Sequence, residues 1–396
     1  MGMANIAGLA EDPLAAISAN PAFLSGQGKS VQASLQTIWV DSEFTSSLGE
    51  RSSADNGPGL IPDIGFVLPL EDSNWTLGGG VTVHSGMLAS FDFTDPPGTL
   101  GVSYGHQTHE SQYSVVNASA ALAYQVTDNM SIGAQIGLAY NRNQLLAPYI
   151  FQSHPALAGL KVLVDLDTDD VSPSFSLGLD YQTDEGNRYY AAYSFENKFS
   201  ADGSTNGNLG QLGLFTQEDF HYDAQVNTAM PAFATAGIVW PSSDNLTLGI
   251  QIDWIGWGSA FESLPIVLTN GTNHELNTLL GESSIADTAP LDWENQVSFK
   301  IGGELTRDDR SYRLGYEYSN APVPTNTMTP MTGATLKHGF SAGMSVPVNR
   351  YTLDLAYRFS MDSGTTNLDA TDLQGGEYAG SRLDLMLHSL SVSMRF

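Results

Sequence analysis

The sequence predicts an all-β protein, a fourteen-stranded antiparallel transmembrane β-barrel with an N-terminal plug (hatch) inside the lumen. Three observations lead to this fold class. Apolar residues alternate with small or polar ones in many segments, tight turns alternate with long polar loops between those segments, and the chain ends in an alternating segment closed by Phe396. Short turns on one rim and long loops on the other are typical of bacterial outer-membrane barrels.

The composition excludes several classes of function. The chain has 396 residues with 15 basic and 43 acidic side chains, so its formal charge is −28. Such a chain offers no basic surface to replace phosphate counterions, which excludes nucleic acid as a partner. The absence of cysteine excludes disulfides, thiolate metal sites and a cysteine nucleophile. Only 15% of the residues are charged, below the roughly 25% of soluble domains.

The first 28 residues do not alternate and are expected to form the plug, while residues 29–396 form the barrel. Asp12 and Pro13 suit the N-cap and first position of a short helix that Asn20-Pro21 ends. An extension of this size can fold into the lumen, which would otherwise be a wide channel. Residues 1–10 lack the basic and apolar regions of a signal peptide, so none is expected in this sequence.

Period-two alternation defines the barrel strands. From Leu246 to Trp254, for example, large apolar residues occupy every second position between Thr, Gly, Gln and Asp. The predicted strands cover residues 30–45, 60–70, 74–92, 110–126, 129–145, 170–183, 187–200, 219–240, 244–261, 292–306, 310–321, 334–347, 350–363 and 381–396. Aromatic residues expected to form an interfacial girdle lie beside the short turns, at Trp75, Tyr124, Tyr181, Tyr189, Trp240 and Tyr351.

Two local features qualify this pattern. In the last strand, the apolar residues around Leu385 are out of phase with those around Val392, which predicts a β-bulge near His388. The longest charge-free stretch, residues 224–243, contains Gln, Asn and Pro and is too short in apolar residues for a membrane helix. A soluble sandwich or propeller is the other all-β fold considered, but it seldom sustains alternation over segments this long.

Short motifs add a resemblance to a known family. Residues 2–5, 10–16 and above all Asn20-Pro21-Ala22-Phe23-Leu24 resemble the plug of the FadL-type long-chain fatty acid transporters. Asp253-Trp254 and residues 314–324 also fit that family. The resemblance implies a fourteen-stranded barrel in the bacterial outer membrane, occluded by a hatch with an Asn-Pro-Ala motif. The family's plug usually begins upstream of the match at Gly2, so the signal peptide and first plug residues are expected to be absent from this sequence.

The third predicted strand contains a candidate lateral gate. Gly78, Gly79 and Gly80 weaken a strand and permit a bend, and Gly86 is a second place for it. The resemblance implies that ligand leaves sideways at a kink in this strand. The alternative is that these glycines relieve crowding beneath the plug.

Candidate ligand-binding residues come from the strands, the loops and the plug. By the resemblance, Arg142 matches a basic residue that meets the ligand headgroup. Its place in the alternation puts it on the apolar face, so this role needs a local bulge or a position above the membrane. Lys337 belongs to a set of lumen-facing charges that form a paired network between wall and plug, or meet a carboxylate ligand. Phe23 and Leu24 should anchor the plug or line a pocket. An apolar site that captures the ligand is expected at Leu146, Tyr149 and Phe151.

These features predict a passive outer-membrane uptake channel for hydrophobic molecules, either long-chain fatty acids or hydrocarbons. The alternative is a surface adhesion or interaction protein that uses the barrel as a scaffold for acidic loops. No nucleophile, base and orienting acid occur together, so we expect no enzyme, and we expect no cofactor or metal. The expected partners are a hydrophobic small molecule and outer-membrane lipid, and the chain is expected to be a monomer.

Overall fold

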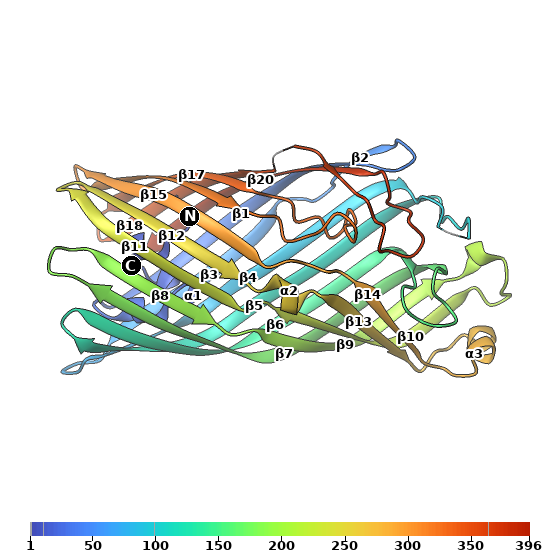
Figure 1. Cartoon of the computed structure of the whole chain (residues 1–396). Coiled ribbons are helices and arrows are strands. Elements are labelled where there is room, and N and C mark those ends of the chain that lie inside the picture. The colour runs from blue at the N-terminus through green and yellow to red at the C-terminus, as the bar shows by residue number, and fades with distance from the viewer. Residues whose placement is uncertain (1, 11, 99, 363) are drawn as a thin grey trace.

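The computed structural model describes residues 2–10, 12–98, 100–362 and 364–396. Strands run obliquely around a closed, elongated barrel (Figure 1). The uninterrupted barrel strands are β1 (Ser30–Thr45), β3 (Gly59–Pro69), β4 (Trp75–Thr94), β5 (His106–Thr127), β6 (Met130–Ile150), β7 (Lys161–Gln182), β16 (Arg310–Ser319), β17 (His338–Val348), β18 (Tyr351–Met361) and β20 (Arg382–Arg395). The barrel closes because β1 pairs with both β3 and β20.

Four further barrel strands are each interrupted once, which makes fourteen over the part of the chain that the structure describes. They are β8 (Arg188–Ser194) with β9 (Asn197–Asn208), β10 (Asp219–Met230) with β11 (Phe233–Ser243), β12 (Leu246–Ile255) with β13 (Ser263–Thr269), and β14 (Ile285–Pro290) with β15 (Gln296–Arg307). Short extra elements are β2 (Arg51–Ser53), β19 (Thr366–Asn367), η3 (Gly210–Leu212), α2 (Trp257–Ala260) and α3 (His274–Leu280). The predicted fourteen-stranded barrel is therefore confirmed.

The strands extend further on the long-loop side than the sequence predicted. Most of the loop expected at 146–169 is strand, because β6 continues to Ile150 and β7 begins at Lys161, and β13 and β14 lie in the loop expected at 262–291. In these extensions beyond the membrane, the apolar residues of a strand point into the barrel and the polar residues point outward, which is the reverse of the order within the membrane. Val162 and Leu166 of β7 pack inward on an apolar cluster, while Asp165 and Asp169 are exposed. Water replaces lipid there, so polar residues face outward.

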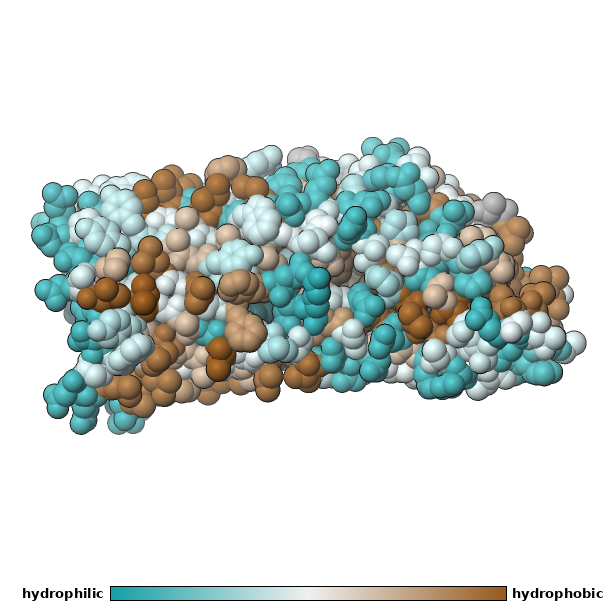
Figure 2. All heavy atoms as spheres, turned by 60° about the horizontal axis from the view of Figure 1, so that its bottom comes forward, coloured by the Kyte–Doolittle hydropathy of each residue, from teal (hydrophilic) through white to brown (hydrophobic). Residues whose placement is uncertain are grey.

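An apolar belt covers the outer face next to the short turns, and the surface is more hydrophilic toward the long loops (Figure 2). Girdle residues pack in pairs near the short turns. Trp75 lies against Tyr124 with ring centroids 4.6 Å apart, and Tyr181 packs beside Tyr189. This arrangement is typical of the interface between hydrocarbon and headgroups.

The predicted bulge near His388 is wrong. Strand β20 pairs with β1 and with β18 in one unbroken register. Leu383 faces inward and is 2% exposed, whereas Met386 and Leu390 face outward and are 40% and 42% exposed. The phase does not change along the strand. The apolar residues around Leu385 are out of phase because the lumen above the plug is apolar, so inward-facing residues of this part of β20 are apolar too.

The plug consists of η1 (Ala7–Leu9), α1 (Pro13–Ser18) and η2 (Pro21–Leu24). Asp12 caps α1, as predicted, by accepting from the backbone N–H of Ala15 at 2.8 Å. Asn20 caps the start of η2 rather than the end of α1. Within the described ranges, no helix has the length and apolar character needed to cross a membrane.

Candidate functional site

The Asn-Pro-Ala motif fixes the plug to the inner wall. Asn20 is fully buried, and its Nδ2 donates to the carbonyls of Leu179 at 3.0 Å and Ala191 at 3.3 Å. Its Oδ1 accepts from the N–H of Ala22 at 3.0 Å. Both Nδ2 and Oδ1 of Asn20 are therefore hydrogen-bonded inside the barrel, where a buried amide without partners would cost free energy.

Phe23 and Leu24 belong to the apolar core that holds the plug. The Phe23 ring meets Tyr190 edge-on at 5.3 Å, and the guanidinium of Arg188 lies 4.1 Å from its centroid. Arg188 also donates to the carbonyl of Gly8 and to Asp180. Of the two roles expected for Phe23 and Leu24, this packing supports anchoring of the plug.

The glycine run in β4 provides space for the plug. A Cβ atom on Gly78 would lie 2.4 Å from Leu24 Cδ2, and one on Gly80 would lie 2.5 Å from Ile17 Cδ1. Gly78, Gly79 and Gly80 all pair with β3 and β5 in regular register. The contacts of Gly78 and Gly80 therefore support the alternative, that these two glycines relieve crowding beneath the plug, whereas a Cβ on Gly79 would meet Ser119 and Phe66 of the wall. Nothing lies within 4 Å of a Cβ on Gly86.

The irregularity in β4 lies between these glycines, at His84. Pairing of β3 with β4 stops at Ile64 and Val81, and the register between β4 and β5 shifts between Val83 and Ser85. Beyond that point, the N–H of Val83 donates to the side chain of Asp63 at 2.9 Å instead of to the β3 backbone. The wall between β3 and β4 is therefore not closed by a ladder here. We call this place the β3–β4 opening.

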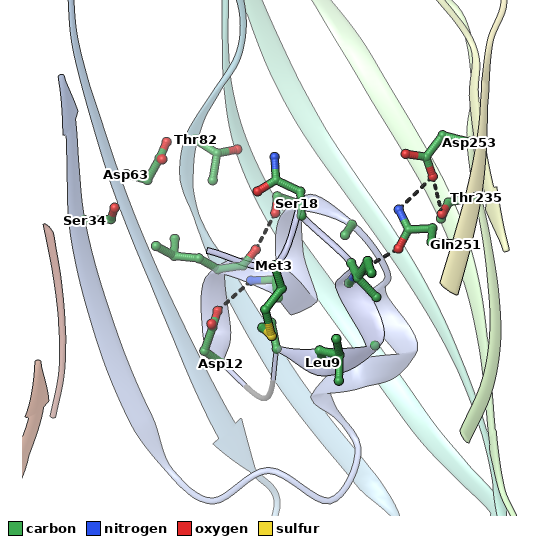
Figure 3. Close-up of a pocket in the computed structure, with 18 of the residues that line it drawn as sticks. Met3, Leu9, Asp12, Ser18, Ser34, Asp63, Thr82, Thr235, Gln251 and Asp253 are labelled. Atoms are coloured by element: carbon green, nitrogen blue, oxygen red, sulfur yellow. Dashed lines mark hydrogen bonds between the residues drawn. The ribbon is translucent and has the colours of Figure 1, made fainter. Parts of the chain in front are cut away.

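A cavity of about 1130 Å³ lies beside the plug (Figure 3). One side is the plug, with Met3, Leu9 and Ser18, and the other is a wall rich in Ser, Gln and charged residues. The β3–β4 opening belongs to the lining through Asp63, Thr82, Val83, His84 and Ser85. At the right of the close-up, across the plug from Asp63, Gln251 accepts from the N–H of Ala7 and donates to Asp253. Gln251 therefore connects the plug to the wall.

The predicted lumenal charges are paired mainly with one another in the wall. Their ion pairs are Arg313 with Glu304 and Asp354, Arg358 with Glu317, and Lys300 with Asp253. Lys337 lies 3.4 Å from Asp362 and does not line the cavity. The contacts between wall and plug come instead from Arg188, Gln251 and Ser341. Gln251 and Ser341 are uncharged and gave no signal in the sequence apart from their inward positions.

Arg142 lies on the outer face of β6, so the structure does not show the bulge that would turn its side chain toward a headgroup in the lumen. Strand β6 pairs with β7 without any shift from Met130 to Ile150, so no bulge turns Arg142 inward. Its side chain is 43% exposed and forms a two-pronged ion pair with Asp167, at 2.6 Å and 3.1 Å.

Above the cavity the lumen is apolar. The upper-lumen cluster contains Phe44, Phe91, Phe93, Tyr113, Phe199, Phe261, Trp293, Met328, Leu368 and Leu383, with further small and aliphatic residues. Most of these residues lie at inward positions of strands or in loops that fold into the mouth. For the strand residues, the signal in the sequence was an apolar side chain at a position that the alternation assigned to the lumen.

A second apolar group, the mouth cluster, lies at the loop end and includes Phe151, Leu157, Val162, Phe220 and Tyr222. Tyr149 packs against it, and Phe151 belongs to it, as the predicted capture site requires. Leu146 does not. Leu146 pairs with the exposed Asp165 of β7, and Leu145 packs on the cluster in its place.

Two buried polar anchors, which the sequence did not reveal, hold the loops over the mouth. Lys161 is fully buried and contacts Asp95 at 2.7 Å, the Pro96 carbonyl at 2.6 Å, and Glu377. Burial raises the pKa of Glu377 to about 7, although Lys161 opposes this shift. Asp287 accepts from Tyr149 and from the backbone of residues 152–154.

Comparison with known proteins agrees with this architecture. A family model described as "Outer membrane protein transport protein (OMPP1/FadL/TodX)" matches residues 1–396. Outer membrane protein P1 of Haemophilus influenzae is 26% identical over 227 residues, which cover 46% of this chain and 48% of that protein. The alignment thus spans about half the length of that relative.

Solved structures show the same fold. A Pseudomonas aeruginosa FadL homologue superposes with a TM-score of 0.76 at 18% identity, covering 98% of this chain and 94% of that one. The P. putida toluene transporter TodX gives a TM-score of 0.76 at 20% identity, covering 96% and 93%. Since the family match extends over the whole chain, this barrel, with its plug seated by Asn20, is an outer-membrane protein that belongs to the OMPP1/FadL/TodX transport family.

Proposed function

We propose that this chain is a passive uptake channel for hydrophobic molecules, either long-chain fatty acids or hydrocarbons. The observation that carries the proposal is the apolar upper-lumen cluster, which lies between the mouth cluster and the cavity beside the plug. A water-filled porin needs a polar lumen. Here aromatic and aliphatic side chains line the interior of the upper barrel, so an apolar solute is favoured there over an ion or sugar.

Capture would begin at the mouth cluster. Phe151, Leu157 and Tyr222 line an apolar pocket under the loop at 151–160, and its volume of about 10 Å³ means that a ligand would enter only by parting these side chains. This arrangement also argues against the adhesion alternative, because the apolar loop residues turn into the mouth rather than form a surface for a partner. A molecule released from this pocket would next meet the upper-lumen cluster.

Release would occur sideways through the β3–β4 opening. The plug fills much of the axial route with a packed core, and the missing ladder at Val83 leaves a gap in the wall beside the cavity. A hydrophobic molecule gains by entering the bilayer directly instead of crossing the aqueous periplasm. Each chain closes its own barrel, so we propose that it functions as a monomer surrounded by outer-membrane lipid.

The test is uptake by cells that lack their own transporters of this kind. We expect cells with the assembled barrel to take up radiolabelled oleate, toluene or both faster than cells without it, while uptake of a sugar stays unchanged. Assembly is checked by the slower gel mobility of the protein after boiling. If the barrel assembles and neither hydrophobic probe enters faster, the proposed function is wrong.

The lateral route has its own test, because the chain contains no cysteine. Pro62→Cys places one thiol on the outer face at the β3–β4 opening, and Phe66→Cys places one on the same face where the ladder is regular. Labelling with a bulky pyrene maleimide should slow uptake at the first position only. Equal effects at both positions, or none, would contradict lateral release there.

A further inference from the structure

The barrel wall has a second place where the ladder is missing, on the opposite side of the four-strand panel β4–β7. Pairing of β7 with β9 ends at Asp169 and Asp202, and pairing of β7 with β8 begins at Ser176 and Ser194. Residues 170–175 of β7 thus face the break between β8 and β9. We call this place the β7–β9 opening.

Pro173 removes a hydrogen-bond donor at this opening. The carbonyl of Phe175 accepts from the N–H of Phe195 at 3.0 Å, so the odd-numbered residues of β7 turn their backbone groups toward β8 and β9. Residues two apart on a strand point the same way. The N–H that Pro173 lacks would therefore have faced the opening, where a proline prevents a ladder bond.

Asp170 replaces the ladder by a side-chain bridge. Its Oδ1 accepts from the N–H of Val171 at 2.7 Å, and its Oδ2 accepts from the N–H of Ser200 at 2.8 Å. The carboxylate satisfies donors of both strands while a whole side chain stands between them. The strands can thus stay apart without leaving those two N–H groups unpaired.

The β3–β4 opening is built in the same way. The N–H of Leu70 donates to the carbonyl of Trp75, so the even-numbered residues of β3, including Pro62, turn their backbone groups toward β4. The N–H that Pro62 lacks would face that gap, and Asp63 accepts from Val83 of the neighbouring strand. Each opening therefore has a proline that removes a donor and an aspartate that bridges the strands.

The cavity reaches the β7–β9 opening as well. Its lining includes Ser174, Phe175, Phe195 and Asn197, although Phe175 and Phe195 are outer-face residues, 51% and 47% exposed. Figure 2 turns this side of the barrel toward the reader, and a hollow is visible near its middle. Both phenyl rings lie on the lipid-facing side at a height well above the short turns.

The lumenal end of this opening offers both apolar and polar contacts. Phe199, just beyond the break in β9, belongs to the upper-lumen cluster. Asn197 is buried, lines the cavity, and neither its Nδ2 nor its Oδ1 has a hydrogen-bond partner. A free amide in such a place would be satisfied by a hydroxyl, carbonyl or carboxyl group of a ligand.

We propose that the β7–β9 opening is a second lateral portal, through which hydrophobic molecules with one polar group pass between the lumen and the bilayer. Asn197 binds the polar group as the apolar part moves past Phe175 and Phe195. The inference rests on the proposed function, because it requires hydrophobic molecules in the lumen. It adds a route on the far side of the panel β4–β7 from the β3–β4 opening.

The test again uses single cysteines on the outer face. Pro173→Cys places a thiol at the β7–β9 opening, and Leu177→Cys is the matched control on β7, where pairing with β8 is regular. Initial uptake of oleate, which carries one carboxyl group, is measured before and after labelling with pyrene maleimide. Labelled Pro173→Cys should lose part of its uptake and keep the remainder, because the β3–β4 opening stays free. Labelled Leu177→Cys should keep its rate.

A second pair of variants separates this portal from the first. In the double variant Pro62→Cys/Pro173→Cys, labelling should remove nearly all transporter-dependent uptake, whereas each single label leaves the other route open. If labelled Pro62→Cys alone removes all of it and labelled Pro173→Cys none, the second portal is excluded. If the unlabelled protein shows no uptake, the proposed function has failed instead.

The role of Asn197 has a separate readout. Asn197→Leu keeps the size of the side chain but removes both hydrogen-bonding groups. With the Pro62→Cys label in place, this variant should slow oleate uptake more than toluene uptake, because toluene has no polar group to bind. Equal slowing of both probes would overturn the assignment of Asn197 to the polar group.

Discussion

Asn20 of the plug occupies the space that a side chain on Gly178 of β7 would need. A Cβ atom built on Gly178 would lie only 1.9 Å from Asn20 Oδ1. The neighbouring strand contributes in the same way, since a Cβ on Gly133 would lie 2.3 Å from the carbonyl carbon of Pro21. The Asn-Pro-Ala motif and these two glycines therefore form one complementary surface.

Gly178→Ala should loosen the plug without unfolding the barrel. The added methyl cannot fit while Asn20 keeps its bonds to Leu179 and Ala191, and overpacking of this kind costs about 1–3 kcal/mol. We expect higher ion conductance in planar bilayers. Gly86→Ala is the matched control, because nothing lies within 4 Å of its Cβ. Equal conductance of the two variants would contradict this role of Gly178.

The loop at 364–380 should be held less firmly as the pH rises. Burial raises the pKa of Glu377 to about 7 in the folded protein, from an ordinary value of 4.5. The stabilisation of the loop by neutral Glu377 is fully present below pH 4.5 and is lost as the pH rises through about 7. Over this range the equilibrium constant for opening of the loop should rise by up to about tenfold per pH unit. Amide hydrogen exchange in the loop, corrected for intrinsic rates, measures this loss. Glu377→Gln stays neutral and should show no such dependence.

Asp287→Asn should free the loop at 151–160. Asp287 accepts from Tyr149 Oη at 2.7 Å and from the N–H groups of Gln152 and Ser153 at 2.9 Å and 2.6 Å. Burial raises the pKa of Asp287, but these bonds outweigh it, so the pKa lies below 3.8. Losing bonds to a charged acceptor costs about 1.5–3 kcal/mol each.

Faster proteolysis within residues 151–160 is the expected measurement for Asp287→Asn, with Asp128→Asn in an exposed short turn as the control. The wild-type anchor is present at neutral pH and weakens only as the pH falls through the low pKa of Asp287. Proteolysis at the wild-type rate in the variant would show that other contacts hold the loop.

Arg142→Ala should leave uptake unchanged. Arg142 lies on the outer face and pairs with Asp167, and such half-exposed ion pairs contribute about 0–1 kcal/mol. Oleate uptake by this variant and by Arg142→Ala/Asp167→Ala should match that of the wild type. A several-fold loss in the single variant would show that the headgroup contact expected from the sequence exists after all.

Local patterns in the sequence determined the barrel: the alternation, the order of short turns and long loops, and the terminal strand. From Leu246 to Trp254 the chemistry of every second residue follows from a wall with lipid on one side and polar lumen on the other, and this rule is local in the sequence. The Asn-Pro-Ala motif and the cap at Asp12 are local signals too. For this reason the strand number, the plug and the outer-membrane location could be predicted.

Only the tertiary structure decided where the wall opens and which charges matter. The consequence of Pro62 or Pro173 depends on which neighbouring strand its missing N–H would face, and that follows from the register of three strands together. Lys161 and Glu377 meet because two distant loops cross over the mouth. Arg142 faces outward because β6 has no bulge, and Leu383 faces a lumen that is apolar above the plug. Each of these depends on contacts between strands and loops far apart in the chain, which a period-two pattern does not encode.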